Sequence, residues 1–102
     1  MKIHIIKTVN PYFNLASQDL KDWELRKNDR DYKVGHWIIS REYSPELNQY
    51  SPHFLTGRIN FILENFPGLE NGYCILSIRY YESTFDIPNS VQEEIEKLGY
   101  EL

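Results

Sequence analysis

The chain has 102 residues, 41% of them hydrophobic and 15% aromatic, with a net charge of −4. This length and apolar content suit one globular domain with one core, which excludes a wholly disordered chain. The single cysteine excludes a disulfide scaffold, and without a long apolar run or a signal-peptide cleavage site we expect an intact cytoplasmic protein without a membrane segment.

The first elements are a strand followed by a helix. Residues 2–7 contain a β-branched run bounded by polar residues, which predicts a strand. Asn10 is a suitable N-cap, and Pro11 suits the first helical position. Apolar residues at helical spacing extend this predicted helix to about Leu20.

A short strand and two turns come next. Apolar and polar residues alternate over 23–26, which predicts a strand with Trp23 and Leu25 facing the core. Asn and Asp are frequent at 28–31, and this composition predicts a turn. A second turn is expected at 33–35, around a glycine.

The middle of the chain predicts three further strands. Residues 36–43 and 73–81 are the clearest of them, and 54–66 also has β composition. Gly57, inside the predicted strand 54–66, indicates a bulge or a close backbone approach. The connecting segments 44–53 and 67–72 are rich in Pro, Ser, Asn and Gly and are expected to be a loop and a turn.

The chain ends in a predicted amphipathic helix. Ser90 and Glu93 have the spacing of a capping box, and Gly99 suits the position after the helix. An apolar stripe consists of Val91, Ile95 and Leu98. About five strands with one early and one late helix predict a mainly β, α+β fold built on a small β-barrel.

The densest polar patch in the chain is residues 21–35. Glu24 and Arg26 are two apart in a predicted strand and share a face, and Lys21 at the end of the preceding helix can reach the same side. A carboxylate acceptor with two cationic donors suits a nucleobase edge and a phosphate. On spacing alone, the same residues are more typical of a solvent-exposed salt bridge, which contributes at most about 1 kcal/mol.

The charge is unevenly distributed along the chain. Residues 1–58 carry nine Lys and Arg against seven Asp and Glu, a net +2, and residues 59–102 carry two against eight, a net −6. The pI is about 5.3, whereas domains that hold duplex nucleic acid mainly through its phosphates have values above about 9. A local basic groove for a single strand or a nucleotide remains compatible with this balance.

Residues 21–35 resemble a known family. Lys21, Glu24 and Arg26 match the Lys-x-x-Glu-x-Arg signature of ASCH domains in the PUA-like superfamily, and residues 24–35 look like a bacterial and phage branch of unassigned function. The resemblance implies a PUA-like barrel over residues 1–81, with residues 82–102 as a helical extension packed on the same domain. It also implies non-catalytic recognition of RNA or a modified nucleotide.

On this hypothesis the signature residues line a cleft, with other basic and aromatic side chains around it. Arg26 and Lys21 would hold a phosphate or a base carbonyl, and Glu24 would accept from an exocyclic amine. The rim would consist of Lys27, Arg30 and Lys33, with Tyr32 or Trp37 available for base stacking.

Two other functions stay open at this point. Some proteins similar to ASCH domains are amidohydrolases of N4-acylated cytidine, with a Thr nucleophile where this chain has Glu24. An enzyme of that kind would here use Lys21 and Glu24 around a bound water. Alternatively, the acidic C-terminal helix would bind a protein partner, as in a phage-type accessory factor. The His and Cys residues lack metal-ligand spacing, so neither a metal nor a cofactor is expected.

Overall fold

The computed structural model describes residues 2–82 and 86–101. The fold is mainly β with two helices, which confirms the coarse class and the number of strands predicted from the sequence. In chain order the elements are β1 (Ile3–Thr8), α1 (Tyr12–Ser17), β2 (Trp23–Lys27), β3 (Trp37–Ser44), β4 (Gln49–Glu64), β5 (Tyr73–Tyr81) and α2 (Asn89–Lys97).

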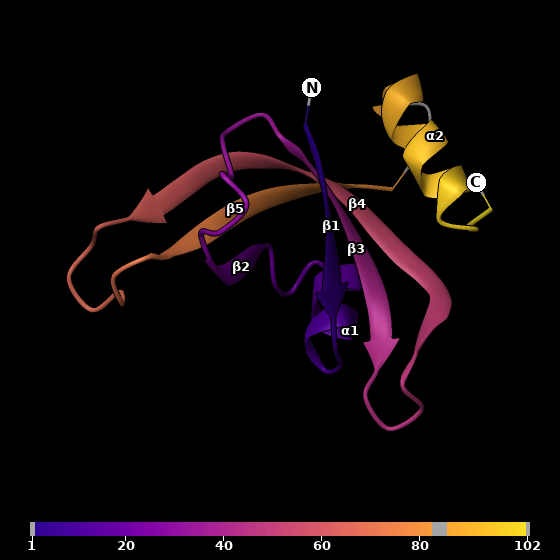
Figure 1. Cartoon of the computed structure of the whole chain (residues 1–102), viewed down its shortest axis with the longest axis horizontal. Helices are drawn as coiled ribbons and strands as arrows, with labels where there is room; N and C mark the ends of the chain where they lie inside the picture. Colours follow the sequence, from indigo (N-terminus) through magenta and orange to yellow (C-terminus); the bar gives the residue numbers. More distant parts are fainter. Residues whose placement is uncertain (1, 83–85, 102) are drawn as a thin grey trace.

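The strands form one strongly curled sheet in the order β1-β3-β4-β5-β2 (Figure 1). β1 and β3 pair in parallel, and the other neighbouring strands pair antiparallel. The curl makes a half-barrel whose two edge strands, β1 and β2, do not pair through their backbones. The small barrel expected from the sequence is therefore open along one seam.

Side chains from β2 and the loop after it bridge this seam. The Arg26 guanidinium donates to the carbonyl oxygen of Lys7 at 3.0 Å, and Arg30 donates to the carbonyl of Ile5. The Lys2 ammonium in turn donates to the carbonyl oxygen of Arg30 at 3.2 Å. Carbonyls on the free edge of β1 thus find donors without a neighbouring strand.

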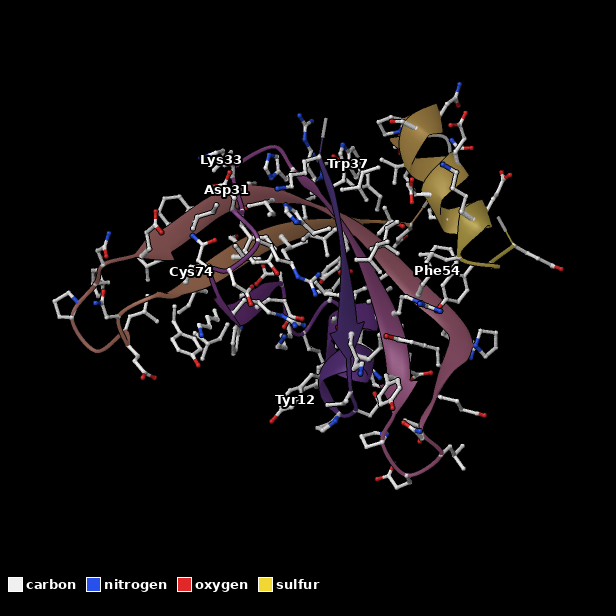
Figure 2. The ribbon with its side chains drawn as sticks, in the orientation of Figure 1. Tyr12, Asp31, Lys33, Trp37, Phe54 and Cys74 are labelled. Atoms are coloured by element: carbon white, nitrogen blue, oxygen red, sulfur yellow. The ribbon has the colours of Figure 1, made fainter. Side chains whose placement is uncertain are left out.

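The apolar core consists of two clusters on opposite faces of the curled sheet. The cluster inside the curl is Ile6, Tyr32, Ile38, Ile59, Cys74, Leu76 and Ile78. The cluster between the sheet and α2 is Trp37, Ile39, Ile87, Val91, Ile95 and Tyr100. Figure 2 shows Trp37 and Phe54 on the side of the sheet toward α2. Val91 and Ile95 are fully buried there, as the predicted helical stripe requires.

Helix α1 is shorter than predicted. It covers Tyr12–Ser17, Pro11 is its N-cap, and the Oδ1 atom of Asn10 accepts a hydrogen bond from the Asn14 amide at 3.0 Å. Asp19 follows with a φ of 59°, a left-handed conformation that a helix cannot contain. Leu20, expected at the end of the helix, is 69% exposed.

The predicted loop over 44–53 is wrong in its second half. β4 begins at Gln49, which pairs with Ser44 of β3, so only residues 45–48 form the turn. The rings of Tyr43 and Tyr50 lie opposite each other, 5.0 Å apart. Cross-strand aromatic pairs stabilise a ladder, and this pairing outweighs the loop-like composition.

At Gly57 the backbone of β4 lies close to residues of β5, which confirms one of the two interpretations of this glycine. A Cβ atom added there would lie 2.4 Å from the Cγ2 atom of Ile78, so no side chain fits without movement. The bulges lie elsewhere, between Ile59 and Phe61 and between Arg41 and Tyr43.

Helix α2 begins one residue before the predicted capping residue. Its N-cap is Pro88, so Ser90 lies in the first turn and the predicted capping box is not formed at the N-cap. The C-terminal end agrees with prediction, because Gly99 follows the helix with a φ of 90°. The Tyr100 amide donates to the Ile95 carbonyl and the Gly99 amide to the Glu96 carbonyl, which is a Schellman motif.

Candidate ligand pocket

Strand β2 faces the opposite way from the sequence prediction. Trp23 is 46% and Leu25 52% exposed, whereas Glu24 is only 7% exposed. Glu24 and Arg26 do share a face, but that face is the inside of the curl. The prediction that Trp23 and Leu25 face the core is wrong because an alternating pattern gives the two faces without telling which one is buried.

Lys21 and Glu24 form a buried ion pair on the inner side of β2. The Nζ atom of Lys21 lies 2.6 Å from the Oε2 atom of Glu24, and it also donates to the carbonyl oxygen of Trp23 at 2.7 Å. Both residues are 7% exposed. Buried charges require such partners because an isolated one is costly. The signature residues therefore do not form a solvent-exposed salt bridge.

Arg26 connects this ion pair to the seam. Its Nη2 atom lies 3.5 Å from the Oε1 atom of Glu24 and 3.0 Å from the carbonyl oxygen of Lys7. One carboxylate oxygen of Glu24 is thus held tightly by Lys21, and the other has only a long contact with Arg26. This second oxygen is able to accept a stronger hydrogen bond from a ligand.

A cavity of about 340 Å³ opens beside these residues, near the lower end of the roughly 300–1,000 Å³ found for small-molecule sites. Its lining residues are Lys7, Thr8, Val9, Tyr12, Lys21, Trp23, Glu24, Leu25 and Arg26. The Lys21 ammonium lies 5.8 Å from the ring centre of Tyr12 and 4.8 Å from that of Trp23. Half-exposed aromatic rings therefore stand beside a charged floor.

The other four predicted binding residues lie outside the pocket. Lys27 is exposed at the end of β2, and Lys33 pairs with Asp31 at 3.4 Å. Arg30 is occupied at the seam. Tyr32 is 5% exposed and packs in the core, with its ring centre 4.6 Å from that of His4, so its faces are not available to a base. Trp37, the other stacking candidate, is 3% exposed.

The resemblance implied a cleft next to the first helix, but the residues of β1 and α1 that line the pocket were not among the predicted site residues. Lys7, Thr8 and Tyr12 line it, and the hydroxyl of Thr8 is 2.6 Å from that of Ser40 on β3. These residues are brought to β2 by the curl and by the parallel pairing of β1 with β3. No local pattern in the sequence reports such long-range contacts.

Three titratable groups near the sheet stay uncharged at neutral pH. Burial, helped by the charge of Glu24, raises the pKa of the Tyr80 phenol. Burial also raises the pKa of the Cys74 thiol, which is fully inaccessible and unsuited to nucleophilic attack. Burial and the neighbouring His36 lower the pKa of His4 to about 4.

Within residues 2–82 and 86–101, no helix is long and apolar enough to cross a membrane. The same residues contain no group of three or more His, Cys, Asp or Glu side chains placed to hold a metal ion. Comparison with curated proteins yields no match. Residues 3–78, more than half of the chain, match the family model described as a domain of unknown function, DUF3850, and the chain belongs to that family.

Proposed function

We propose that the protein recognises RNA or a modified nucleotide without catalysing a reaction, and that one unpaired base enters the pocket beside β2. The observation that carries the proposal is the buried Lys21–Glu24 pair in the floor of a cavity with aromatic walls. Such a floor offers a donor and an acceptor to a base edge, and flat rings offer stacking.

The size and charges of the pocket favour a single base over a duplex. A cavity of about 340 Å³ admits one small planar group and not a double helix. The second oxygen of Glu24 suits an exocyclic amine, and the Arg26 guanidinium beside it suits a carbonyl or a phosphate. The acidic pI of about 5.3 also argues against binding driven mainly by phosphate charge.

We also propose that the half-barrel is of the PUA-like, ASCH type. The support is that the three residues of the Lys-x-x-Glu-x-Arg signature meet in one pocket next to the first helix. Hydrolysis is less compatible with this geometry. The Lys21 nitrogen is already engaged by the Glu24 carboxylate and the Trp23 carbonyl, and Glu24 stands where the hydrolases similar to ASCH domains carry a Thr nucleophile.

Binding can be tested by calorimetric titration with nucleosides, nucleotides and short single-stranded RNA. The informative variant is Lys21→Met/Glu24→Leu, which removes both charges together, because replacing a buried ion pair by apolar residues usually preserves folding. Arg26 is less suitable, since it also bridges the seam. We expect the wild type to bind and the double variant to bind about tenfold or more weakly.

A matched control is Phe66→Leu, which trims an exposed aromatic side chain away from the pocket. It is expected to bind as the wild type does. If the Lys21→Met/Glu24→Leu variant folds and binds every RNA ligand normally, the pocket is not the site. Turnover of an N4-acylcytidine by the wild type, abolished in a folded Lys21→Met/Glu24→Leu variant, would instead indicate the hydrolase.

A further inference from the structure

Two arginines lie opposite each other on the outer face of the sheet, outside the pocket. Arg58 of β4 and Arg79 of β5 are direct partners in the antiparallel ladder, so their side chains leave the same face. Both are exposed. Arg79 is one of only two basic residues in the acidic half of the chain, residues 59–102.

This pairing places two positive charges together without a carboxylate between them. Like charges directly opposite in a ladder destabilise it. Among the described residues, neither arginine takes part in an ion pair. The Nε atom of Arg58 donates to the carbonyl oxygen of Gly35 at 3.2 Å, and the guanidinium of Arg79 lies 5.2 Å from the ring centre of Tyr81. Most of their N–H groups therefore remain available to an anion.

A hollow of about 330 Å³ lies between the two arginines. It is lined by Val34, Gly35, Arg58, Ile59, Asn60, Arg79 and Tyr81. Asn60 is the extra residue at the bulge, where the register passes from Ile59 to Phe61. Bulges redirect a side chain out of the regular ladder, and here the bulged residue adds an amide to the hollow.

An exposed aromatic row lies next to the arginine pair on the same face. Trp23 of β2 and Phe61 of β4 both pair with Ser77 of β5, the small residue between them. Ser77 precedes Arg79 by two residues, about 7 Å along the strand. Trp23 and Phe61 are 46% and 58% exposed, and Trp23 also lines the pocket. Stacking surface and cationic groups thus lie together on this face, and Trp23 connects them to the pocket.

We propose that the Arg58–Arg79 hollow binds a phosphate group, and that its physiological ligand is a backbone phosphodiester of single-stranded RNA. A planar guanidinium fork matches phosphate geometry, and two of them neutralise its charge. A strand held here would cross the Trp23–Phe61 row and continue toward the pocket. The phosphate site depends only on the arginine geometry, whereas its assignment to RNA rests on the proposed function.

Two measurements on the full chain test this site. The first follows the Arg Nε–Hε resonances by NMR during titration with inorganic phosphate, a nucleoside monophosphate and a short oligouridylate. The second measures oligouridylate affinity against salt concentration for the wild type and the Arg58→Gln/Arg79→Gln variant. Lys97→Gln and Glu94→Gln/Lys97→Gln are controls, because Lys97 lies on α2 away from this hollow.

We expect the oligouridylate to shift the Arg79 resonance and to bind about tenfold or more weakly to the double arginine variant. The slope of log affinity against log salt should fall by about 0.7 for each phosphate that the variant no longer neutralises. The Lys97 controls should stay within about twofold of the wild type. The arginine variant should melt close to the wild type, since the repulsion that it removes offsets the loss of the Arg58 hydrogen bond to Gly35.

Three other results separate this site from the pocket. If a short oligocytidylate, whose bases carry the exocyclic amine that suits Glu24, binds with a dependence on Lys21 and Glu24 and its affinity is unchanged in the arginine variant, the outer site is wrong and the pocket stands. If inorganic phosphate or the monophosphate shifts the arginines while RNA does not bind at all, the hollow is a phosphate site and the RNA assignment is wrong. If no phosphate compound shifts either arginine, the proposal is overturned.

Discussion

The two halves of the curled sheet differ in what covers their outer faces. In the half formed by β1 and β3, helix α2 packs on the outside, and four consecutive residues of β3, Trp37 to Ser40, are buried. In the arm formed by β2, β5 and the end of β4 (Figure 1), Trp23 and Phe61 remain exposed. The inner side of β2 is occupied by charged residues.

This difference separates a half that is apolar on both sides of β3 from an arm that carries the ion pair and the exposed rings of the proposed binding surface. The covered half buries apolar side chains on both faces of β3, Ile38 inside the curl and Trp37 and Ile39 toward α2, and their burial contributes strongly to the folding free energy. The arm combines a buried ion pair with exposed aromatic rings, an arrangement that contributes little to folding. Each variant below is directed at one side of this comparison.

The largest effect on stability is expected when only one residue of the Lys21–Glu24 ion pair is replaced. Lys21→Met leaves the Glu24 carboxylate buried with only the 3.5 Å contact to Arg26. Removing one partner of a buried pair destabilises a protein by about 3–5 kcal/mol, because the remaining charge is uncompensated. Urea denaturation at neutral pH measures this destabilisation.

The control is the double variant Lys21→Met/Glu24→Leu, in which no charge is left unpaired. We expect it to recover most of the stability that Lys21→Met removes, since well-packed apolar residues replace buried pairs at little cost. A double variant as unstable as the single one would show that the packing of Lys21, and not its charge, is what the arm requires.

The covered half is tested by Ile95→Ala in α2. Ile95 is fully buried between the helix and the sheet, and truncation of such a side chain costs about 3 kcal/mol through reduced burial and the remaining cavity. Glu96→Ala, on the exposed side of the same helix, should change stability by less than about 0.5 kcal/mol. A decrease below about 1 kcal/mol for Ile95→Ala would indicate that α2 unfolds separately from the sheet.

A smaller effect, dependent on pH, is expected where β1 meets the loop before β3. The Nε2 atom of His4 lies 2.9 Å from the Nδ1 atom of His36, and burial followed by the charge of His36 lowers the pKa of His4 to about 4. The unfolded chain binds this proton near pH 6.5 and the folded chain does not, so stability falls as the pH drops from about 6.5 to about 4.

At pH 5 the expected decrease in stability relative to pH 7.5 is about 2 kcal/mol, measured by urea denaturation at both pH values. The lowered pKa of His36 acts in the same direction. His4→Phe should flatten this pH dependence while keeping a ring against Tyr32, and His53→Gln, at an exposed position, should not. An unchanged profile in His4→Phe would show that the decrease in stability has another source.

Much of the fold follows from local patterns in the sequence. Alternation located β2, the β-branched and aromatic run located β5, and Gly99 located the end of α2. The start of β4 was missed because Pro52 and the serines near it resemble a loop. The pairing of Tyr43 with Tyr50 joins two strands, so it could not be predicted from the sequence of either strand alone.

The candidate site could be predicted only in part. Lys21, Glu24 and Arg26 were identified from their spacing, and the structure places them together in one pocket. The sequence could not tell whether these residues face the inside or the outside of the sheet. An alternating pattern separates the two faces of a strand without identifying the buried one. The roles of Lys7 and Tyr12 depend on the curl of the sheet, and the pairing of Arg58 with Arg79 depends on register across two strands.

The smallest effect on folding stability is expected from a substitution of Trp23, a residue of the uncovered arm. Its side chain is 46% exposed on the uncovered arm, so Trp23→Ser, which removes only a partly buried ring, should lower the free energy of unfolding by about 1 kcal/mol. Stacking of a base on an aromatic ring contributes about 1–3 kcal/mol, so the same variant should weaken oligouridylate binding by about fivefold or more. Anisotropy titration and urea denaturation of one sample measure both quantities. A substitution that lowers stability by several kcal/mol would mean that Trp23 supports the sheet, and the division between a stable covered half and a recognising arm would then be wrong.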